Sequence, residues 1–391
     1  MVKPFQFARI PKILFGPGKI GDLPLIASDF GKRIILVTGK ESFSGTGRDD
    51  KLIHDLAGKG ISCDRVIVSG EPSPELIDSV SAKFDVELIF LVVAIGGGST
   101  VDAGKAISAM VGKQIPVMEF LEGVGTREHP GTKIPFIAVP TTSGTGSEAT
   151  KNAVISQIGR GGFKRSLRHD NLVPDIAIVD PQLTLSCPPD ITAATGMDCF
   201  TQLVEAFLSD KAIAYTDALA FEGIKAVKES LEKSYIDGSG LPARSGMSFA
   251  ALTSGICLAN AGLGIVHGFA SSIGGLFNIP HGLVCGSLMA KANEVTVRKL
   301  RGTGQVSTPL IKYSQLGNLF SGKEGRSNDF YTDAFIDYLH YMNDLFHFPG
   351  FKQFGMSADD ISRICLSTEN KNNPVKLNKE EIEEILVSRF F

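Results

Sequence analysis

Hydrophobic and polar residues follow different patterns in the two halves of the chain. In the first half, short runs rich in Val and Ile alternate with mixed segments that suit helices. The runs are residues 34–38, 65–69, 88–96, 134–140 and 175–180, and the mixed segments include 50–59 and 74–84. This alternation predicts a parallel, doubly wound sheet whose strands are buried on both faces. Such sheets bind ligands at the carboxyl ends of their strands, where turns meet the starts of helices.

The pattern changes near residue 188 to apolar residues three and four positions apart, which is typical of helices. The expected helical segments are residues 191–210, 216–234, 249–275 and 335–348. We therefore expect an α/β domain with a Rossmann-like parallel sheet over residues 1–187 and an all-α domain over residues 188–391. The stretch 301–330 is rich in Gly, Ser and Asn, which favours a loop insertion.

A glycine-rich turn follows the apolar run 88–96 and precedes a helical pattern. Residues 96–98 are all Gly, which lets the backbone turn tightly and approach a ligand closely. Ser99 and Thr100 can cap the following helix, and Asp102 lies in its first turn. Exposed amides at a helix N-terminus favour a pyrophosphate. The spacing is neither GxGxxG nor a P-loop, and a simple tight connection would have the same glycines.

A second loop, PTTSGTGSEAT at residues 140–150, also follows a predicted strand. It holds six hydroxyl side chains and two glycines in eleven residues, which offers many hydrogen bonds to a ligand. A solvated linker would have a similar composition. Its position at the carboxyl end of a buried strand favours ligand binding.

Four residues of the second half form a candidate metal site. Asp198 and Gln202 are four positions apart in a predicted helix and share one face, while His267 and His281 lie far downstream. A carboxylate, an amide oxygen and two imidazoles can hold a divalent ion and leave a position open for substrate. The alternative is structural: hydrogen-bonded core histidines, and an Asp198 that caps a helix near Gly196.

Bulk properties exclude several classes of partner. The chain has 39 Lys and Arg against 42 Asp and Glu, which argues against nucleic acid and anionic membranes as partners. Its apolar runs are far shorter than the roughly 20 residues that cross a bilayer. The six cysteines are widely spaced without a CxxC pair, which favours reduced thiols. We expect a cytoplasmic protein.

Taken together, these motifs resemble the iron-containing alcohol dehydrogenase family. The resemblance rests on GGGSTVDAGKA, PTTSGTGSEAT, VPDIAIVDPQLTLSCPPDITAATGMD and the HG pairs at 267 and 281, and it extends over essentially the whole chain. It implies a dinucleotide-binding domain, a helical metal-binding domain like that of dehydroquinate synthase, and an active site between them. It also implies NAD(P)-dependent interconversion of a small alcohol with its aldehyde or ketone, and a homodimer or larger homo-oligomer.

The resemblance also implies roles for individual residues. It assigns cofactor contacts to Gly97, Gly98, Ser99, Asp102, Thr141, Thr142, Thr145, Ser147 and Lys164. It assigns metal binding to Asp198, His267 and His281.

The chain departs from the family pattern at two positions. The fourth metal ligand is normally a histidine but is Gln202 here, and a neutral amide oxygen should lower the affinity for Fe²⁺ or Zn²⁺. Ser271 stands where some relatives carry another histidine, so a proton relay there would use Ser271, water or ribose hydroxyls. Without a metal, His267 or His281 would act as the catalytic group by donating a hydrogen bond to the carbonyl.

Cofactor preference is predicted from the end of the run 34–38. NAD-specific sites usually place an acid at such a strand end to bind the ribose 2′-hydroxyl. Gly39 removes that acid, and Lys40 and Ser42 suit a 2′-phosphate, whereas Glu41 argues the other way. We predict that NADP(H) is favoured over NAD(H).

Two alternative functions remain open at this point. Lys164, Arg165 and Arg168 would suit an anionic substrate, as in a polyol-phosphate dehydrogenase or a reductase of an acidic aldehyde. Gln202 and Ser271 would suit a protein that binds the cofactor without turning over a substrate.

Overall fold

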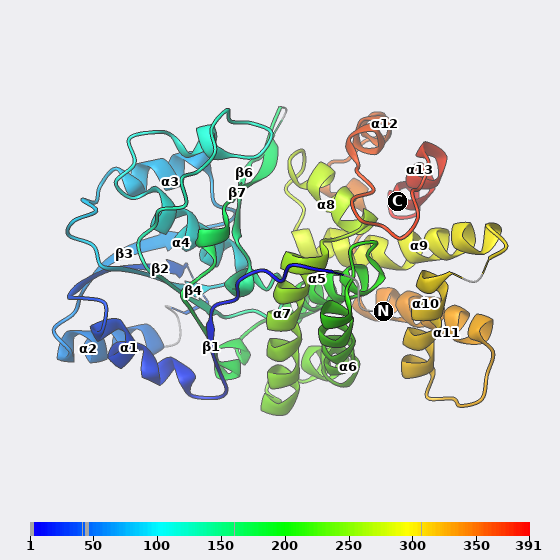
Figure 1. Ribbon diagram of the computed structural model, residues 1–391, viewed down its shortest axis with the longest axis horizontal. Helices are drawn as coiled ribbons and strands as arrows, with labels where there is room; N and C mark the ends of the chain where they lie inside the picture. The colour runs from blue at the N-terminus through cyan, green and yellow to red at the C-terminus, as the bar shows by residue number, and fades with distance from the viewer. Residues whose placement is uncertain (1–3, 41, 44–46, 160, 306) are drawn as a thin grey trace.

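The protein consists of a sheet-containing half and a helical half that lie side by side (Figure 1). The computed structural model describes residues 4–40, 42–43, 47–159, 161–305 and 307–391. The chain enters through an extended N-terminal segment that runs across the helical half before it reaches the sheet. In that segment the amide of Ala8 donates to Asn260 Oδ1 at 2.6 Å, and Phe5 and Phe7 contact the ring of Tyr215.

The N-terminal half is built on a six-stranded sheet in which every neighbouring pair is parallel. In spatial order the strands are β1 (Lys12–Phe15), β8 (Ile176–Val179), β5 (Phe136–Pro140), β4 (Leu91–Gly96), β2 (Arg33–Gly39) and β3 (Ser62–Val68). The predicted parallel sheet is therefore confirmed. Two details were wrong. The edge strand β3 is buried on one face alone, because Val66 and Val68 pack in an apolar core while Ile67 on the opposite face is exposed, and β4 begins only at Leu91.

Helices cover both faces of the sheet because successive strand residues point to opposite sides. Ile35 and Val37 of β2 pack on one face with residues of α3 and α4, while Ile34 and Leu36 pack on the other with α1 and α2. The helices are α1 (Leu23–Ser28), α2 (Arg48–Gly58), α3 (Pro74–Ser81) and α4 (Gly98–Met110). This is the doubly wound arrangement that the alternating pattern predicts.

A two-stranded antiparallel hairpin leaves the sheet after the second loop, and the sequence pattern did not indicate it. It consists of β6 (Asn152–Gln157) and β7 (Phe163–Arg168). The polar sequence FKRSLR hides the second strand. It forms because its backbone pairs along the whole length of β6, and α8 of the helical half packs against it.

The C-terminal half contains helices and no strand among the residues described from Pro189 onward. They are α5 (Pro189–Leu208), α6 (Ala214–Ile236), α7 (Leu241–Ala261), α8 (Ile265–Gly274), α9 (His281–Gly302), α10 (Thr308–Ser321), α11 (Asn328–Phe346), α12 (Ala358–Ser367) and α13 (Lys379–Val387). They share one large apolar core. Within the described ranges, no single helix is long and apolar enough to cross a membrane. Helices α7 and α8 have the necessary length and apolar composition only when taken together, and they are bent by 98° relative to each other.

Two expectations about this half were wrong. Residues 249–275 do not form one helix, because Gly262 adopts a φ of +70° and the chain turns between α7 and α8. The stretch 301–330 is not a loop, because it contains α10. Tyr313 and Leu316 of that helix are buried, and the Gly and Ser residues that obscured their helical spacing lie mostly at its ends.

The two halves meet in a backbone contact between the second loop and α7. A Cβ atom on Gly255 would lie 2.1 Å from the carbonyl oxygen of Gly146, and one on Gly146 would lie 2.5 Å from the backbone of α7. Only glycine fits at either position. The contact fixes the loop at residues 140–150 directly against the helical half.

Candidate metal and cofactor site

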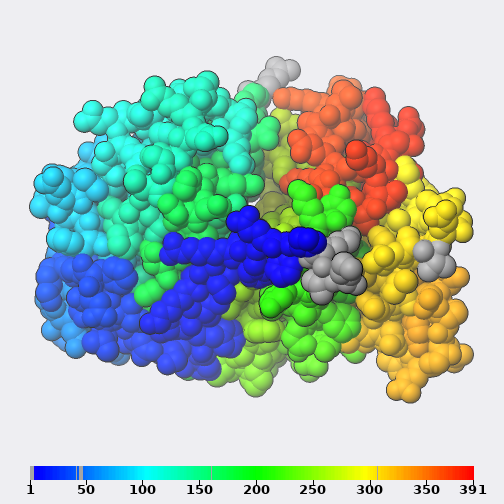
Figure 2. Space-filling view, viewed as in Figure 1, coloured from blue at the N-terminus to red at the C-terminus, as the bar shows by residue number. Residues whose placement is uncertain are grey.

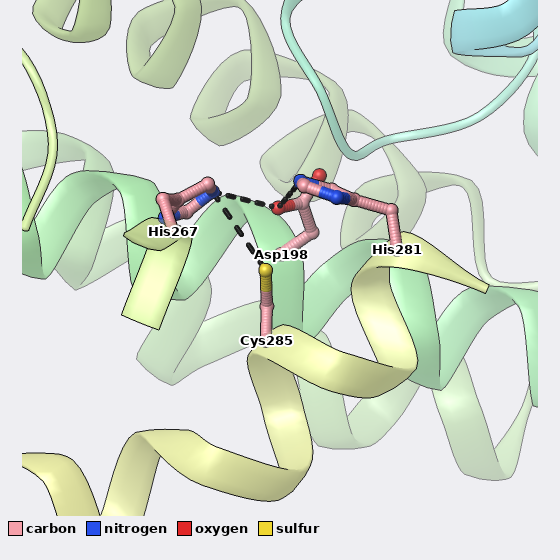
Figure 3. Close-up of side chains that lie close together, drawn as sticks. All are labelled: Asp198, His267, His281 and Cys285. Atoms are coloured by element: carbon pink, nitrogen blue, oxygen red, sulfur yellow. Dashed lines mark hydrogen bonds and ion pairs between the residues drawn. The ribbon is translucent and has the colours of Figure 1, made fainter. Parts of the chain in front are cut away.

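Four side chains from three helices converge in the helical half (Figure 3). Asp198 comes from α5, His267 from α8, and His281 and Cys285 from α9, and their ligand atoms all lie within 4.8 Å of one another. Asp198 Oδ1 is 3.2 Å from His267 Nε2 and 3.7 Å from His281 Nε2. Three of the four are buried, and the side chain of His281 is 25% exposed. The structure thus brings together Asp198, His267 and His281, three of the four residues of the predicted metal site.

Local backbone geometry aims these residues at each other. The turn after Gly262 bends the chain by 98° and points α8 back toward α5, so that His267 faces Asp198. His281 begins α9 directly after Pro280, and Cys285 follows one turn later on the same face. Asp198 lies inside α5 and does not cap it, which rules out the structural alternative for that residue.

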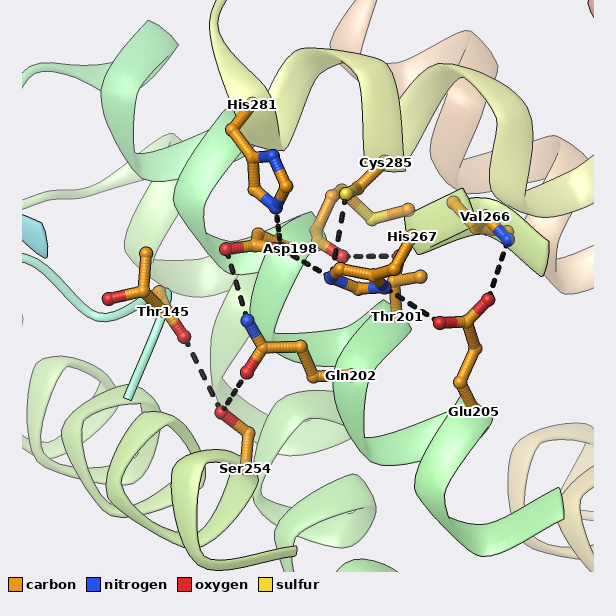
Figure 4. A network of polar contacts seen from close by, with 12 residues as sticks. Thr145, Asp198, Thr201, Gln202, Glu205, Ser254, Val266, His267, His281 and Cys285 are labelled. Atoms are coloured by element: carbon orange, nitrogen blue, oxygen red, sulfur yellow. Dashed lines mark hydrogen bonds and ion pairs between the residues drawn. The ribbon is translucent and has the colours of Figure 1, made fainter. Parts of the chain in front are cut away.

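A buried carboxylate orients His267 from behind. His267 Nδ1 lies 2.7 Å from Glu205 Oε2, and the amide of Val266 donates to Glu205 Oε1 at 2.7 Å (Figure 4). Such a carboxylate fixes the ring so that the other nitrogen faces a metal. The sequence analysis missed Glu205, although its position seven residues after Asp198 places both on one face of α5.

Burial and neighbouring groups shift the pKa values of the four side chains in the cluster. Burial raises the pKa of Asp198, but His281 and His267 outweigh burial and lower it, so this group is a carboxylate. Burial lowers the pKa of His281 to about 4 and raises that of the Cys285 thiol to about 11. Burial also lowers the pKa of His267, but Cys285, Glu205 and Asp198 outweigh it and raise the pKa well above its usual value.

This donor set fits a divalent transition metal. A carboxylate, two imidazoles and a thiol are ligands such ions prefer, and a bound ion displaces the protons of the imidazole and thiol. In addition, Nδ1 of His281 is buried and has no hydrogen-bond partner among the described residues. An unpaired buried polar atom of this kind is consistent with a ligand site here.

Gln202 lies beside the cluster, but its oxygen does not point into it (Figure 4). Its Nε2 donates to Asp198 Oδ2 at 3.3 Å, and its Oε1 accepts from Ser254 Oγ at 2.9 Å. The opposite orientation would place two acceptor oxygens 3.3 Å apart. The structure therefore brings the predicted fourth ligand to the site as a hydrogen-bond partner of Asp198, and brings in Cys285, which the sequence analysis overlooked.

Ser271, the second departure from the family pattern, lies at the edge of the site. Its hydroxyl donates to the carbonyl of His267 at 2.8 Å and accepts from Lys371 Nζ at 3.2 Å. Lys371 adopts a φ of +48°, which is uncommon for a residue with a side chain. The lysine thus adds a cation that the sequence analysis had not considered.

The two predicted cofactor loops lie next to each other because β4 and β5 are neighbours in the sheet. The amide of Thr141 donates to the Gly96 carbonyl at 2.9 Å and joins the loops at their start. The hydroxyls of Thr141 and of Thr38, at the end of β2, are buried without a partner in the described part of the chain. Unpaired buried hydroxyls at the carboxyl edge of the sheet are consistent with a ligand site there.

The glycine turn forms the N-terminus of α4, but its cap differs from the expectation. Gly97 is the capping residue, and Ser99 and Thr100 lie within the first turn. The first amides of a helix have no acceptor inside it, so those of Gly98 and Ser99 are available to an anion. Thr142 and Thr145 of the second loop flank this turn. A Cβ on Gly97 would be 3.6 Å from Thr142, and one on Gly98 only 2.7 Å from Thr145.

Asp102 and Ser147, both predicted to contact the cofactor, hydrogen-bond to each other. Asp102 also accepts from the amide of Val154 at 3.1 Å. Beside them the buried ammonium of Lys105 donates to Ser147 and to Thr150 Oγ1 at 3.1 Å. The network fastens the second loop onto α4, so these side chains shape the loop whether or not they touch the ligand.

The remaining predicted cofactor residues lie around the two loops. Lys164 on β7 pairs with Glu71 at 3.0 Å, and Ser99 Oγ lies 3.5 Å from the same carboxylate. Gly39 ends β2, next to Ser42 and the exposed Lys40. Glu41 lies outside the described residues. Figure 2 shows the surface hollowed between the cyan and green residues of the sheet-containing half and the orange C-terminal segments.

We expect Glu205→Gln to weaken metal binding roughly tenfold, because the amide can serve only one of the two donors that Glu205 now accepts from. Titration of the metal-free variant with Zn²⁺, followed by competition with a chelator, measures this. Glu222→Gln, on the exposed surface of α6, is the control. An unchanged affinity in Glu205→Gln would show that His267 does not depend on the carboxylate.

A second prediction concerns Glu148, which is buried in the loop that Lys105 fastens. Burial raises its pKa to about 7, against the attraction of Lys105. The folded state therefore binds more protons than the unfolded state between pH 4.5 and 7, and stability falls as pH rises through this window. The free energy of unfolding of Glu148→Gln should therefore rise relative to that of the parent as the pH increases from 4 to 8, by up to about 3 kcal/mol. Urea unfolding at each pH measures this, with the exposed Glu324→Gln as control. A difference in free energy of unfolding between Glu148→Gln and the parent that does not change with pH would contradict the prediction.

Two family models match nearly the whole chain. The model described as "Iron-containing alcohol dehydrogenase" matches residues 11–181, and that described as "Fe-containing alcohol dehydrogenase family, C-terminal" matches residues 192–390. Together they span both the sheet with its loops and the helices that hold the Asp198 cluster.

Individual relatives agree with the family models. The chain is 30% identical to the NADPH-dependent butanol dehydrogenase of Clostridium saccharobutylicum, covering 97% of this chain and 96% of that protein. It is also 30% identical to the NAD-dependent methanol dehydrogenase of Bacillus methanolicus, covering 96% and 97%. The solved alcohol dehydrogenase from Oenococcus oeni superposes with a TM-score of 0.86 at 28% identity, covering 99% of this chain and 100% of that one.

The sheet with its paired loops thus lies in the part that the first family model matches, residues 11–181, and the buried cluster in the part that the second matches, residues 192–390. Such proteins use a nicotinamide cofactor and a divalent metal to oxidise alcohols. The chain belongs to the iron-containing alcohol dehydrogenase family.

Proposed function

We propose that this oxidoreductase interconverts a small, neutral alcohol and its aldehyde, with NADP(H) preferred over NAD(H). The observation that carries the proposal is the buried convergence of Asp198, His267 and His281 in a chain whose two strand-end loops meet at a helix N-terminus, next to buried hydroxyls without a partner among the described residues. When bound there, a divalent metal supplies Lewis acidity that polarises the substrate oxygen.

The chain's own residues perform positioning. Glu205 fixes the ring of His267, and the partly exposed His281 lies on the side of the cluster that solvent reaches. The amides of Gly98 and Ser99 at the start of α4 bind the pyrophosphate. A nicotinamide held there would supply the hydride chemistry, and the protein would contribute orientation and charge.

The decisive experiment follows NADPH and NADH absorbance with short aldehydes, using metal-stripped protein supplied with Fe²⁺, Zn²⁺, Mn²⁺ or no metal. Metal-dependent oxidation of NADPH is the expected result. Turnover that needs no metal would move carbonyl polarisation to His267 or His281. Bound cofactor without turnover under every condition would overturn the proposal.

The preference for NADP(H) can be tested separately at Gly39. Gly39→Asp adds a carboxylate where a ribose 2′-hydroxyl would be bound and a 2′-phosphate repelled. Its Cβ would meet mainly Ser42 Oγ, at 2.8 Å, and that side chain can rotate away. We expect the ratio of kcat/KM for NADPH over NADH to fall about tenfold, or about 1.4 kcal/mol. An unchanged ratio would contradict the assignment of this strand end.

The two curated relatives compared above are named as butanol and methanol dehydrogenases, which favours a neutral alcohol over an anionic substrate, a polyol phosphate or a non-catalytic binder. A cytoplasmic location and a homo-oligomer remain part of the proposal. All six cysteines are unpaired in the structure, which supports a reducing compartment.

A further inference from the structure

We propose that Cys285 is a metal ligand in this protein, in the place that Gln202 leaves open, and that the site consequently selects Zn²⁺. The proposal deepens the proposed function and rests on its divalent metal site. It assigns Asp198, His267, His281 and Cys285 as the four protein ligands.

Three of the six distances between the ligand atoms lie close to the edges of a zinc tetrahedron. With Zn–N and Zn–O near 2.0–2.2 Å and Zn–S near 2.3 Å, ideal angles place N and O about 3.4 Å apart and N and S about 3.6 Å apart. Asp198 Oδ1 lies 3.2 and 3.7 Å from the two imidazoles, and Cys285 Sγ lies 3.7 Å from His267 Nε2. The sulfur therefore lies at the distance from His267 Nε2 that is expected between two ligands of one zinc ion.

Gln202, in contrast, would have to rearrange before it could bind the same ion. Its oxygen accepts from Ser254 Oγ, which also lies 2.8 Å from the Ala251 carbonyl within α7. Turning that oxygen toward the metal would break this bond and remove the bond from Nε2 to Asp198. In its present orientation Gln202 supports Asp198 by binding the carboxylate oxygen that does not face the histidines.

A buried cysteine is often only a small apolar residue, and three others of this half illustrate that role. Cys199, Cys257 and Cys365 are buried, yet none belongs to a group of metal-ligating side chains among the described residues. Cys285 differs because its sulfur faces two ligand residues and follows His281 by one helical turn. A thiolate is a soft ligand, so its presence favours Zn²⁺ over Fe²⁺.

X-ray absorption at the zinc edge of the reconstituted full-length protein tests the assignment. We expect one sulfur scatterer at about 2.3 Å in the parent, and only nitrogen and oxygen scatterers in Cys285→Ser. Cobalt substitution gives a second readout, because a sulfur-to-cobalt charge-transfer band should appear in the parent and disappear in Cys285→Ser. The matched control, Cys257→Ser in α7, should retain both signals.

Zinc affinity completes the test. Cys285→Ser should raise the zinc dissociation constant at least tenfold, whereas Gln202→Ala should change it less than Cys285→Ser does. Zinc bound through nitrogen and oxygen alone in the parent would overturn the role of Cys285 and leave the proposed dehydrogenase intact. A parent that binds no divalent metal would overturn the metal site itself. Loss of zinc in Gln202→Ala, with retention in Cys285→Ser, would restore Gln202 as the ligand.

Discussion

Replacing His267 with Ala should abolish stoichiometric metal binding and lower kcat/KM at least about 1,000-fold, or about 4 kcal/mol of transition-state stabilisation. His267 is the central member of the cluster, because its Nε2 contacts both Asp198 and Cys285 while its Nδ1 is fixed by Glu205. Removing the ring also leaves the buried Glu205 carboxylate with the amide of Val266 as its one hydrogen-bond donor among the described residues.

Metal analysis and steady-state kinetics on the same samples check this prediction. His340→Ala is the matched control, since His340 is exposed and pairs only at the surface with Glu294. Its metal content and activity should equal those of the parent. An active, metal-loaded His267→Ala would show that the cluster is not where the metal acts.

Gly98→Ala should raise the dissociation constant of NADPH by about 100-fold, or about 2.7 kcal/mol, without loss of bound metal. The added Cβ would lie 2.7 Å from Thr145 Cγ2 and 2.8 Å from its Oγ1, so rotating the threonine only exchanges one clash for the other. The second loop must therefore move away from the start of α4, and the anion site formed between them is lost.

Fluorescence titration with NADPH and calorimetric unfolding separate binding from stability in this variant. Gly58→Ala, at the end of α2 with nothing within 4 Å of the added Cβ, is the control and should bind NADPH normally. Unchanged NADPH affinity in Gly98→Ala would place the pyrophosphate away from this turn.

The sequence predicted the parts of the fold that have a strong period. β2, β4, β5 and β8 are apolar throughout because helices cover both faces of the sheet, and an uninterrupted Val and Ile run is a direct sign of that. α5 and α6 were predicted because their apolar positions repeat along more than five turns. The hairpin β6–β7 was not predicted, because its two strands are held by pairing with each other and by packing of β7 against α8. Amino-acid composition does not reveal either interaction.

The sequence could predict only those residues of the site whose side-chain type by itself indicates metal binding. Asp198, His267 and His281 carry groups that few buried positions tolerate, so their pattern was visible in the chain. Cys285 was treated as one of six scattered cysteines, because the fold and not its spacing gives it the histidines as neighbours. Gln202 shows the opposite limit: its position was correct, but the direction of its amide depends on Ser254, which lies 52 residues away.

The contact between Gly146 and Gly255 has a mechanical consequence. Because no side chain separates the two backbones, we expect any motion between the halves to be small at this point. Ser254 precedes Gly255 on α7 and lies 3.4 Å from the carbonyl of Gly144 on the loop. Ser254 also donates to Gln202, which in turn donates to Asp198, so the loop is coupled to the metal cluster through two hydrogen bonds, and we expect the cluster to stay assembled in such a motion.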